Sequence, residues 1–364
     1  MAGDHRAACR RGRGRRCVVG RVPLPVGQPA AGGARRSRAG HRRLSTVRPR
    51  HPPQRRPADL AVRRAGGSGR DGVARGVGAG QPLTSAPPQA PPVALSTASV
   101  YPESVEAGFA LAAELGYDGI ELMVWNDPVS QDPAAVRRLI DRYGVPVLAV
   151  HAPCLLVTQR VWDPNPVIRL RRAAVAAEAL GAGTVVVHPP FRWQRRYVRA
   201  FADEVAHAEE RSGVAIAVEN MFPVRRSGIT ATPYAPDHDP TSAGHPRYTL
   251  DLSHTAAAGM DALELMDRMG VGPDGGLTHV HLTDGSGSTR DEHLVPGRGS
   301  QPCAEVCEQL VQRGFAGTVV VEISTKRVRT RAERSELLTE SLDFARLHLQ
   351  PEEAPATPPP APQH

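Results

Sequence analysis

The chain has 364 residues, of which 40% are hydrophobic, enough apolar material for one large domain or two ordinary ones. It has neither a run of about 20 apolar residues nor an apolar signal core behind its charged N-terminus, so we expect neither membrane insertion nor secretion. The five cysteines are odd in number and lack Cys-x-x-Cys spacing, which favours a reducing, cytoplasmic location over a disulfide scaffold.

The net charge of +8 averages two very different parts of the chain. Residues 1–92 contain 20 Arg, no Lys, three acidic residues and no aromatic residue, a net charge of +17, so the remaining residues carry −9. Because this segment lacks helix or strand periodicity and large apolar groups, we expect it to be disordered. It is either a basic arm for nucleic acid, a cleaved transit peptide or, the explanation we favour, an over-extended reading frame from GC-rich DNA.

Residues 93–350 alternate short β-branched runs with longer amphipathic segments, which indicates repeated βα units and a parallel sheet. The eight predicted strands begin at Val93, Tyr117, Pro146, Thr184, Val214, Arg247, Leu277 and Thr318. Helices are predicted over residues 102–116, 134–144, 168–180, 196–211, 255–270, 304–314 and 332–349. This pattern predicts a (β/α)8 TIM barrel. An open doubly wound sheet is the alternative, but no Gly-x-Gly-x-x-Gly follows the first strand.

Two segments lack a regular pattern. Residues 222–246 are too rich in Pro and Gly for a full helix, and we expect this long loop to lie over the mouth of the barrel. Residues 351–364 form a Pro-rich tail without packing material, which we expect to be disordered.

Residues able to bind a metal recur at the C-terminal ends of the predicted strands, the catalytic face of a TIM barrel. In chain order they are His151, His188, Glu219, Asp251, His254, His279, His281, Asp291, His293 and Glu322. A single such His is more often a hydrogen-bonded core residue, and Asp251 could instead cap the following helix. An ionised Glu at the end of an apolar strand, however, is costly unless it is paired or bound to a cation. Because residues able to bind a metal recur at the ends of six consecutive strands, the sequence predicts a metal centre.

The donor set is a mixture of imidazoles and carboxylates without thiolate. Such a set suits one to three divalent ions, either Zn, Mn, Fe, Co or Mg. Cys154, Cys303 and Cys307 are expected to be core residues rather than ligands. We expect Trp125 and Trp193 in the core too, with a place beside the substrate as the alternative.

The sequence from about residue 93 to 350 resembles the xylose-isomerase-like TIM barrel superfamily. This superfamily includes sugar-phosphate isomerases and epimerases, and abasic-site endonucleases of the endonuclease IV type. The resemblance rests on VEN at Glu219, DLSHTAAAG from Asp251, HLTD from His281, DEHLVPGRG from Asp291 and VVVEIS at Glu322. It excludes both terminal segments.

In epimerase-like members one divalent ion is held by a Glu, an Asp, a His and a second Glu. The resemblance places these ligands on Glu219, Asp251, His281 and Glu322. It also implies that the two glutamates form the acid–base pair and that His254 contacts a substrate oxygen. The Arg that these enzymes often have six residues after the ligand His is replaced by Gly287, so Arg290 or Arg298 would have to contact the sugar.

Endonuclease IV-type members bind three zinc ions with a larger ligand set. The resemblance places the additional ligands on His151, His188, His254, Asp291 and His293. In that chemistry the ions activate a water and clamp a phosphodiester. The net acidic charge after residue 92 argues against a broad nucleic-acid surface. The only dense basic cluster there, Arg192, Arg195, Arg196 and Arg199, is either a phosphate site or a solvated helix face.

The sequence thus predicts a divalent-metal-dependent isomerase or epimerase of a sugar or sugar phosphate. The alternative is a three-metal abasic-site endonuclease or phosphodiesterase, which would have nucleic acid as its partner. A barrel that binds metal or sugar without turnover is a third interpretation, against which the two intact glutamates argue. The oligomeric state is left open.

Overall fold

The computed structural model describes residues 90–226 and 229–351, so our expectations for residues 1–89 and 352–364 lie outside it. Eight parallel strands close into a barrel in the order β1-β10-β9-β8-β5-β4-β3-β2. Their bounds are β1 (Val93–Ser96), β2 (Gly119–Met123), β3 (Val147–His151), β4 (Thr184–Val187), β5 (Ala215–Glu219), β8 (Tyr248–Asp251), β9 (Leu277–Leu282) and β10 (Thr318–Val321). All eight predicted strands are present, and the TIM barrel is confirmed.

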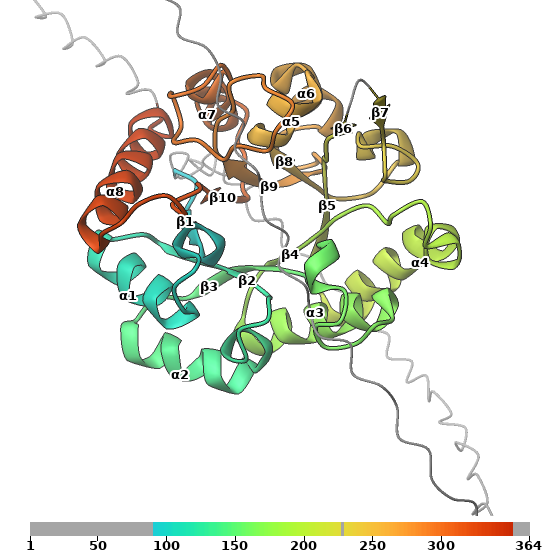
Figure 1. The fold of residues 1–364 in the computed structure, drawn as a ribbon, viewed down its shortest axis with the longest axis horizontal. Coiled ribbons are helices and arrows are strands. Elements are labelled where there is room, and N and C mark those ends of the chain that lie inside the picture. The colour runs from blue at the N-terminus through green and yellow to red at the C-terminus, as the bar shows by residue number, and fades with distance from the viewer. Residues whose placement is uncertain (1–89, 227–228, 352–364) are drawn as a thin grey trace, which may run out of the picture. The chain divides into compact units, whose positions relative to one another are not determined.

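Helices surround the ring of strands (Figure 1). Their bounds are α1 (Val105–Leu115), α2 (Pro133–Tyr143), α3 (Pro166–Leu180), α4 (Arg195–Ser212), α5 (Leu252–Ala258), α6 (Ala262–Met269), α7 (Cys303–Gln312) and α8 (Arg331–His348). Gly116, Gly144 and Gly181 end the first three of them in the left-handed conformation. Within the described residues, every helix is too short or too polar to cross a bilayer.

The single helix predicted over residues 255–270 is wrong, because the structure has two helices there. Gly259 ends α5 with a φ of 71°, a conformation that glycine adopts without steric cost. Asp261 then caps the N-terminus of α6, accepting hydrogen bonds from the backbone N–H groups of Leu263 (2.9 Å) and Glu264 (3.0 Å). The break shortens α5, whose first turn carries His254, a residue that lines the central cavity.

Residues 222–246 contain no α-helix in their described part, as expected. They form a hairpin of β6 (Val224–Arg226) and β7 (Ile229–Ala231), followed by a 3-10 helix, η4 (Pro240–Ala243). The hairpin lies at the rim rather than across the ring of strands (Figure 1). None of the described residues of this segment lines the central cavity, but Phe222 packs on His254, which does, with the ring centres 4.9 Å apart. A cover over the mouth stays a prediction.

The strands are built from buried apolar residues, with a few polar exceptions that define the site. All four residues of β4 are buried, and so are those of β10 except Thr318. Four ionisable residues within strands have no exposed surface at all: Glu121 on β2, Asp251 on β8, and His279 and His281 on β9. Because an isolated buried charge is costly, these side chains must be paired or bound to a cation.

Candidate metal centre

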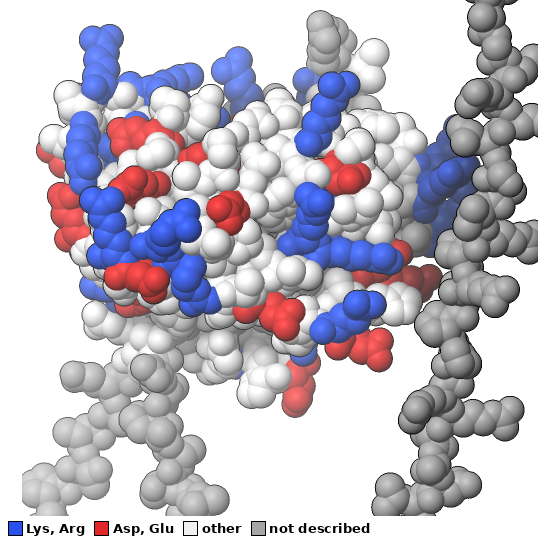
Figure 2. Space-filling model, turned by 90° about the horizontal axis from the view of Figure 1, so that it is seen from below, with Lys and Arg blue, Asp and Glu red and all other residues white. Residues whose placement is uncertain are grey.

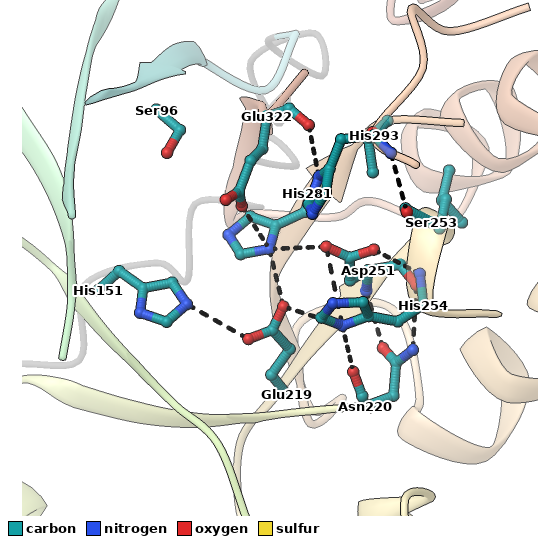
Figure 3. Close-up of polar contacts among 12 residues, drawn as sticks. Ser96, His151, Glu219, Asn220, Asp251, Ser253, His254, His281, His293 and Glu322 are labelled. Carbon is teal, nitrogen blue, oxygen red and sulfur yellow. Dashed lines mark hydrogen bonds and ion pairs between the residues drawn. The ribbon is translucent and has the colours of Figure 1, made fainter. Parts of the chain in front are cut away.

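Three carboxylates converge on one ring nitrogen at the C-terminal end of the barrel (Figure 3). The Nδ1 atom of His281 lies 3.0 Å from Glu219 Oε1, 3.2 Å from Asp251 Oδ2 and 3.1 Å from Glu322 Oε2. One ring nitrogen carries at most one proton, so it cannot donate to three carboxylates at once. Separations of this size suit donors that share one ion at about 2.0–2.2 Å. Glu219, Asp251 and His281 therefore form a donor set that could hold a divalent cation, and Glu322, the fourth ligand implied by the epimerase resemblance, contacts the same nitrogen of His281.

A second cluster adjoins the first through Glu219. The other carboxylate oxygen of this residue, Oε2, lies 3.0 Å from His188 Nε2 and 3.4 Å from His151 Nε2. This oxygen makes no hydrogen bond to any described residue despite being buried. Two imidazoles and a carboxylate form a donor set that suits a transition-metal ion.

A third cluster lies on the opposite side of Asp251 and combines it with His254 and His293. Asp291 joins this cluster, with its Oδ2 atom 2.9 Å from His293 Nε2 and 3.6 Å from His254 Nε2. Glu219 and Asp251 each belong to two clusters, so the nine predicted ligands form one continuous array.

Backbone carbonyls fix the tautomers of three histidines in this array. A carbonyl oxygen only accepts, so the ring nitrogen that faces it must carry a proton. The Nδ1 atom is the donor in all three: His151 to Ala152 (3.0 Å), His254 to Asn220 (2.8 Å) and His293 to Glu322 (2.9 Å). Each Nε2 atom therefore points into the array, toward a carboxylate, and its proton is the one that a cation would displace.

Asp251 both caps a helix and faces the metal centre. Its Oδ1 atom accepts a hydrogen bond from the backbone N–H of His254 (2.8 Å), at the start of α5. Its Oδ2 atom faces His281. The side chain of Asn220 holds the Asp251 backbone through two hydrogen bonds, of 2.8 and 3.0 Å. The capping and metal-binding interpretations of Asp251 are thus compatible, because each uses a different oxygen.

The electrostatics of the array favour a bound cation. Burial opposes ionisation of Glu219, but the imidazoles of His281 and His188 hold the pKa of this carboxyl well below its usual range. Burial raises the pKa of Glu322 and lowers that of His188, so His188 tends toward the neutral form that binds metals. Although burial opposes the charged form, Asp251 and Asp291 raise the pKa of His254 to about 10, and the neighbouring carboxylates hold the pKa of His281 well above its usual value. The buried carboxylates thus attract positive charge, which protonated imidazoles supply and which a bound cation would supply in their place.

A cavity of about 190 Å³ opens over the array. Glu219, Asp251 and Glu322 line it, together with Trp125 and Lys326. The remaining lining residues are Ala98, Met123, His151, Leu155, His188, His254, Asp291, Glu292, His293, Ile323 and Ser324. This volume is below the roughly 300–1,000 Å³ typical of drug-sized ligands, so it suits a small substrate.

The basic residues predicted to contact substrate do not line this cavity. Arg298 is directed away from it, since its Nε donates to Glu340 on α8 at 2.8 Å. The guanidinium of Arg192 donates to the backbone carbonyls of Thr232 (2.8 Å) and Pro236 (2.7 Å) and so holds the loop after β7. Arg290 is exposed and lies outside the cavity. The same holds for the other three arginines of the basic cluster, Arg195, Arg196 and Arg199.

The structure adds residues that sequence reasoning missed. Lys326 lines the cavity mouth, and the chain contains no other lysine among its 45 basic residues. Trp125 lines the cavity and stacks on Tyr101 at 5.4 Å, so the expectation of a core role is wrong for it. Trp193 is 55% exposed, so the same expectation is wrong there. A second missed residue is Glu121, and the signal that could have found it was a carboxylate in the middle of an apolar strand.

The fold and the array agree with comparisons to known proteins. The family model described as "Xylose isomerase-like TIM barrel" matches residues 109–348. The chain belongs to this xylose isomerase-like family. A solved structure titled "D-tagatose 3-epimerase-like protein" superposes with a TM-score of 0.52 at 25% sequence identity, covering 71% of this chain and all of the other.

Two relatives illustrate the similarity of this chain to other proteins. The protein named "Uncharacterized protein Rv0498" of Mycobacterium tuberculosis (strain ATCC 25618 / H37Rv) is 56% identical over 276 residues, which are 71% of this chain and 97% of that protein. Fructoselysine 3-epimerase of Escherichia coli O157:H7 is 22% identical over 246 residues, which are 61% of this chain and 86% of the epimerase.

Proposed function

We propose that the protein is a divalent-metal-dependent isomerase or epimerase of a sugar or sugar phosphate, with Glu219 and Glu322 as its acid–base pair. One observation carries the proposal: carboxylate oxygens of both residues lie 3.0 and 3.1 Å from the same His281 nitrogen, and both residues line a cavity sized for a small substrate. The similarity to fructoselysine 3-epimerase and to the D-tagatose 3-epimerase-like structure supports this assignment.

The residues of the chain divide the chemistry in a simple way. Asp251 and His281 hold the cation together with the two glutamates, and a bound cation polarises a substrate carbonyl and hydroxyl, which acidifies the neighbouring C–H. Glu219 removes that proton at the end of β5. Glu322, which directly follows β10 and is separated from β5 by β8 and β9, returns a proton to the other side. His254 lines the cavity and contacts a substrate oxygen.

Lys326 is positioned to select substrates that carry an anionic group. It is the only Lys or Arg among the described lining residues, and it has no ion pair with a described residue. Its ammonium lies 5.6 Å from the centre of the Tyr101 ring, beside the stacked Trp125. When the reacting carbons of a sugar phosphate face Glu219 and Glu322, its phosphate would thus contact Lys326 at the mouth.

Replacing Lys326 with Met is expected to raise KM for a sugar phosphate by about 10-fold, since a hydrogen bond to a charged group contributes about 1.5–3 kcal/mol. The KM for the corresponding neutral sugar should change less than twofold. Steady-state kinetics on ribulose 5-phosphate and ribulose make this comparison. Arg327→Met removes an adjacent exposed cation that does not line the cavity, and it should affect neither KM. Equal KM changes for both sugars would contradict the assignment of Lys326.

A phosphodiesterase of the endonuclease IV type is the second candidate function. The clusters around His188 and His293 favour it, because they provide donor sets for two ions beside the central one. The charge distribution argues against a nucleic-acid partner, since Figure 2 shows Lys and Arg side chains interspersed with Asp and Glu over the face in view rather than a continuous basic surface.

Two activity assays and a measurement of the metal ions bound per chain distinguish the two candidate functions. For the isomerase, we expect deuterium exchange from solvent into a panel of ketoses and ketose phosphates, with no nicking of duplex DNA that carries an abasic site. One metal ion per chain suits the isomerase and three suit the phosphodiesterase. Nicking without exchange would overturn the proposed function.

A further inference from the structure

We propose that Glu121 is a positioning residue of the metal centre, which accepts a hydrogen bond from His281 Nε2 and thereby reserves His281 Nδ1 for the cation. Glu121 lies on β2 and His281 on β9, and β1 and β10 separate these strands in the barrel. Their side chains therefore meet across the barrel interior. The inference rests on the metal centre of the proposed function but not on its substrate.

The geometry defines the tautomer of His281. Its Nε2 atom lies 3.0 Å from Glu121 Oε2, and neither residue has exposed surface. An ionised carboxylate only accepts, so Nε2 must carry a proton. The proton on Nδ1 is then the one that a cation displaces, and Nδ1 is the atom that faces Glu219, Asp251 and Glu322. A ligand imidazole commonly donates its second N–H in this way, which orients the ring and raises its basicity.

His281 differs from the other histidines of the array in what holds its ring. Backbone carbonyls hold the rings of His151, His254 and His293 through Nδ1. The ring of His281 has the opposite orientation, with Nδ1 rather than Nε2 facing the array. His281 lies within β9, which pairs with β8 on one side and β10 on the other. Its Nε2 partner is therefore a side chain from across the barrel, which explains a fully buried carboxylate below the cavity.

His279 provides an internal comparison. Its Nε2 atom lies 3.1 Å from the same Glu121 oxygen, but this nitrogen makes no hydrogen bond to a described residue. The three residues could alternatively hold an additional ion. That alternative would require His281 to bind metal through both ring nitrogens, whereas the positioning role requires only the ordinary neutral imidazole. The two arrangements predict different metal stoichiometries.

The test is a Co²⁺ titration, followed by visible absorption, of the wild-type chain, Glu121→Gln and His279→Gln. We expect Glu121→Gln to bind the same number of ions as the wild type, with an affinity lower by about 10–100-fold, the usual effect of altering such a partner, because the amide oxygen is an uncharged and weaker acceptor than the carboxylate. His279→Gln should bind with wild-type affinity. Wild-type affinity in Glu121→Gln would overturn the inference. So would the loss of one whole equivalent in both variants, which would indicate an additional ion.

A second measurement needs no change at Glu121 and covers the case in which Glu121→Gln fails to fold. In the Zn²⁺-loaded wild-type chain with ¹⁵N-labelled histidine, NMR should detect one imidazole that is protonated on Nε2 and bound to zinc through Nδ1. This signal should be missing in His281→Ala. Detection of only Nδ1-protonated imidazoles would overturn the inference. A wild-type chain without bound metal would overturn both the inference and the proposed function, which separates the two failures.

Discussion

Glu219→Gln is expected to lower proton exchange by about 10²–10⁴-fold, the usual contribution of a general acid or base. Gln has the size of Glu and keeps an oxygen donor, so the ion held by Asp251, His281 and Glu322 should remain bound. The amide cannot take the substrate proton at neutral pH, which removes the chemical step. Deuterium incorporation from solvent into a ketose, measured by NMR beside the metal content of the same sample, checks both parts.

A matched variant distinguishes this effect from the mere loss of a carboxylate. Glu305→Gln makes the same change at an exposed position on α7, outside the cavity, and should exchange at the wild-type rate. Glu322→Gln should lose exchange like Glu219→Gln, because both members of the pair must act in each turnover. A metal-loaded Glu219→Gln that exchanges at the wild-type rate would refute the assignment of Glu219.

Local patterns were enough to predict the barrel. Each strand is a short β-branched run, and glycines such as Gly144 and Gly181 end the helices in positions that are visible in the sequence. The break between α5 and α6 was missed because the apolar pattern is regular on both sides of Gly259, so a single glycine does not by itself indicate a helix end. It becomes a helix end only together with the capping residue Asp261, two positions later.

The convergence of the proposed metal ligands was predictable for a geometric reason. Parallel strands end at the same rim, so polar residues at successive strand ends must converge whatever the detailed packing. This reasoning needs only the order of the strands, and all nine predicted ligands lie in the array. It does not extend to contacts that depend on the direction of a side chain between distant segments.

Arg298 and Glu121 show where that reasoning stops. Arg298 follows β9 in a loop near the mouth, and its position alone suggested a substrate contact. Its partner Glu340 lies 42 residues away on α8, and no local pattern relates the two. Glu121 contacts His281 over a separation of 160 residues and across the barrel interior. Both contacts are set by tertiary packing and not by the neighbouring sequence.

Asp251→Ala is expected to lose the bound metal and, independently, about 1 kcal/mol of stability, the usual contribution of an N-cap side chain. The metal is lost because the carboxylate leaves the central cluster and the cluster with His254 and His293. The stability is lost because Oδ1 no longer caps α5. Metal content by elemental analysis measures the first effect, and urea unfolding in the presence of a chelator measures the second.

Two further variants separate the functions of these oxygens. Asp251→Asn keeps a capping oxygen but removes the charge, so it should lose metal while the chelated form remains as stable as the wild type. Asp261→Ala removes the cap of α6, away from the array, so it should lose about 1 kcal/mol and keep its metal. If Asp251→Asn retained metal at the wild-type affinity, the charge of Asp251 would not be needed at the centre. Asp251 would then be a capping residue alone, and the convergence on His281 would need another explanation.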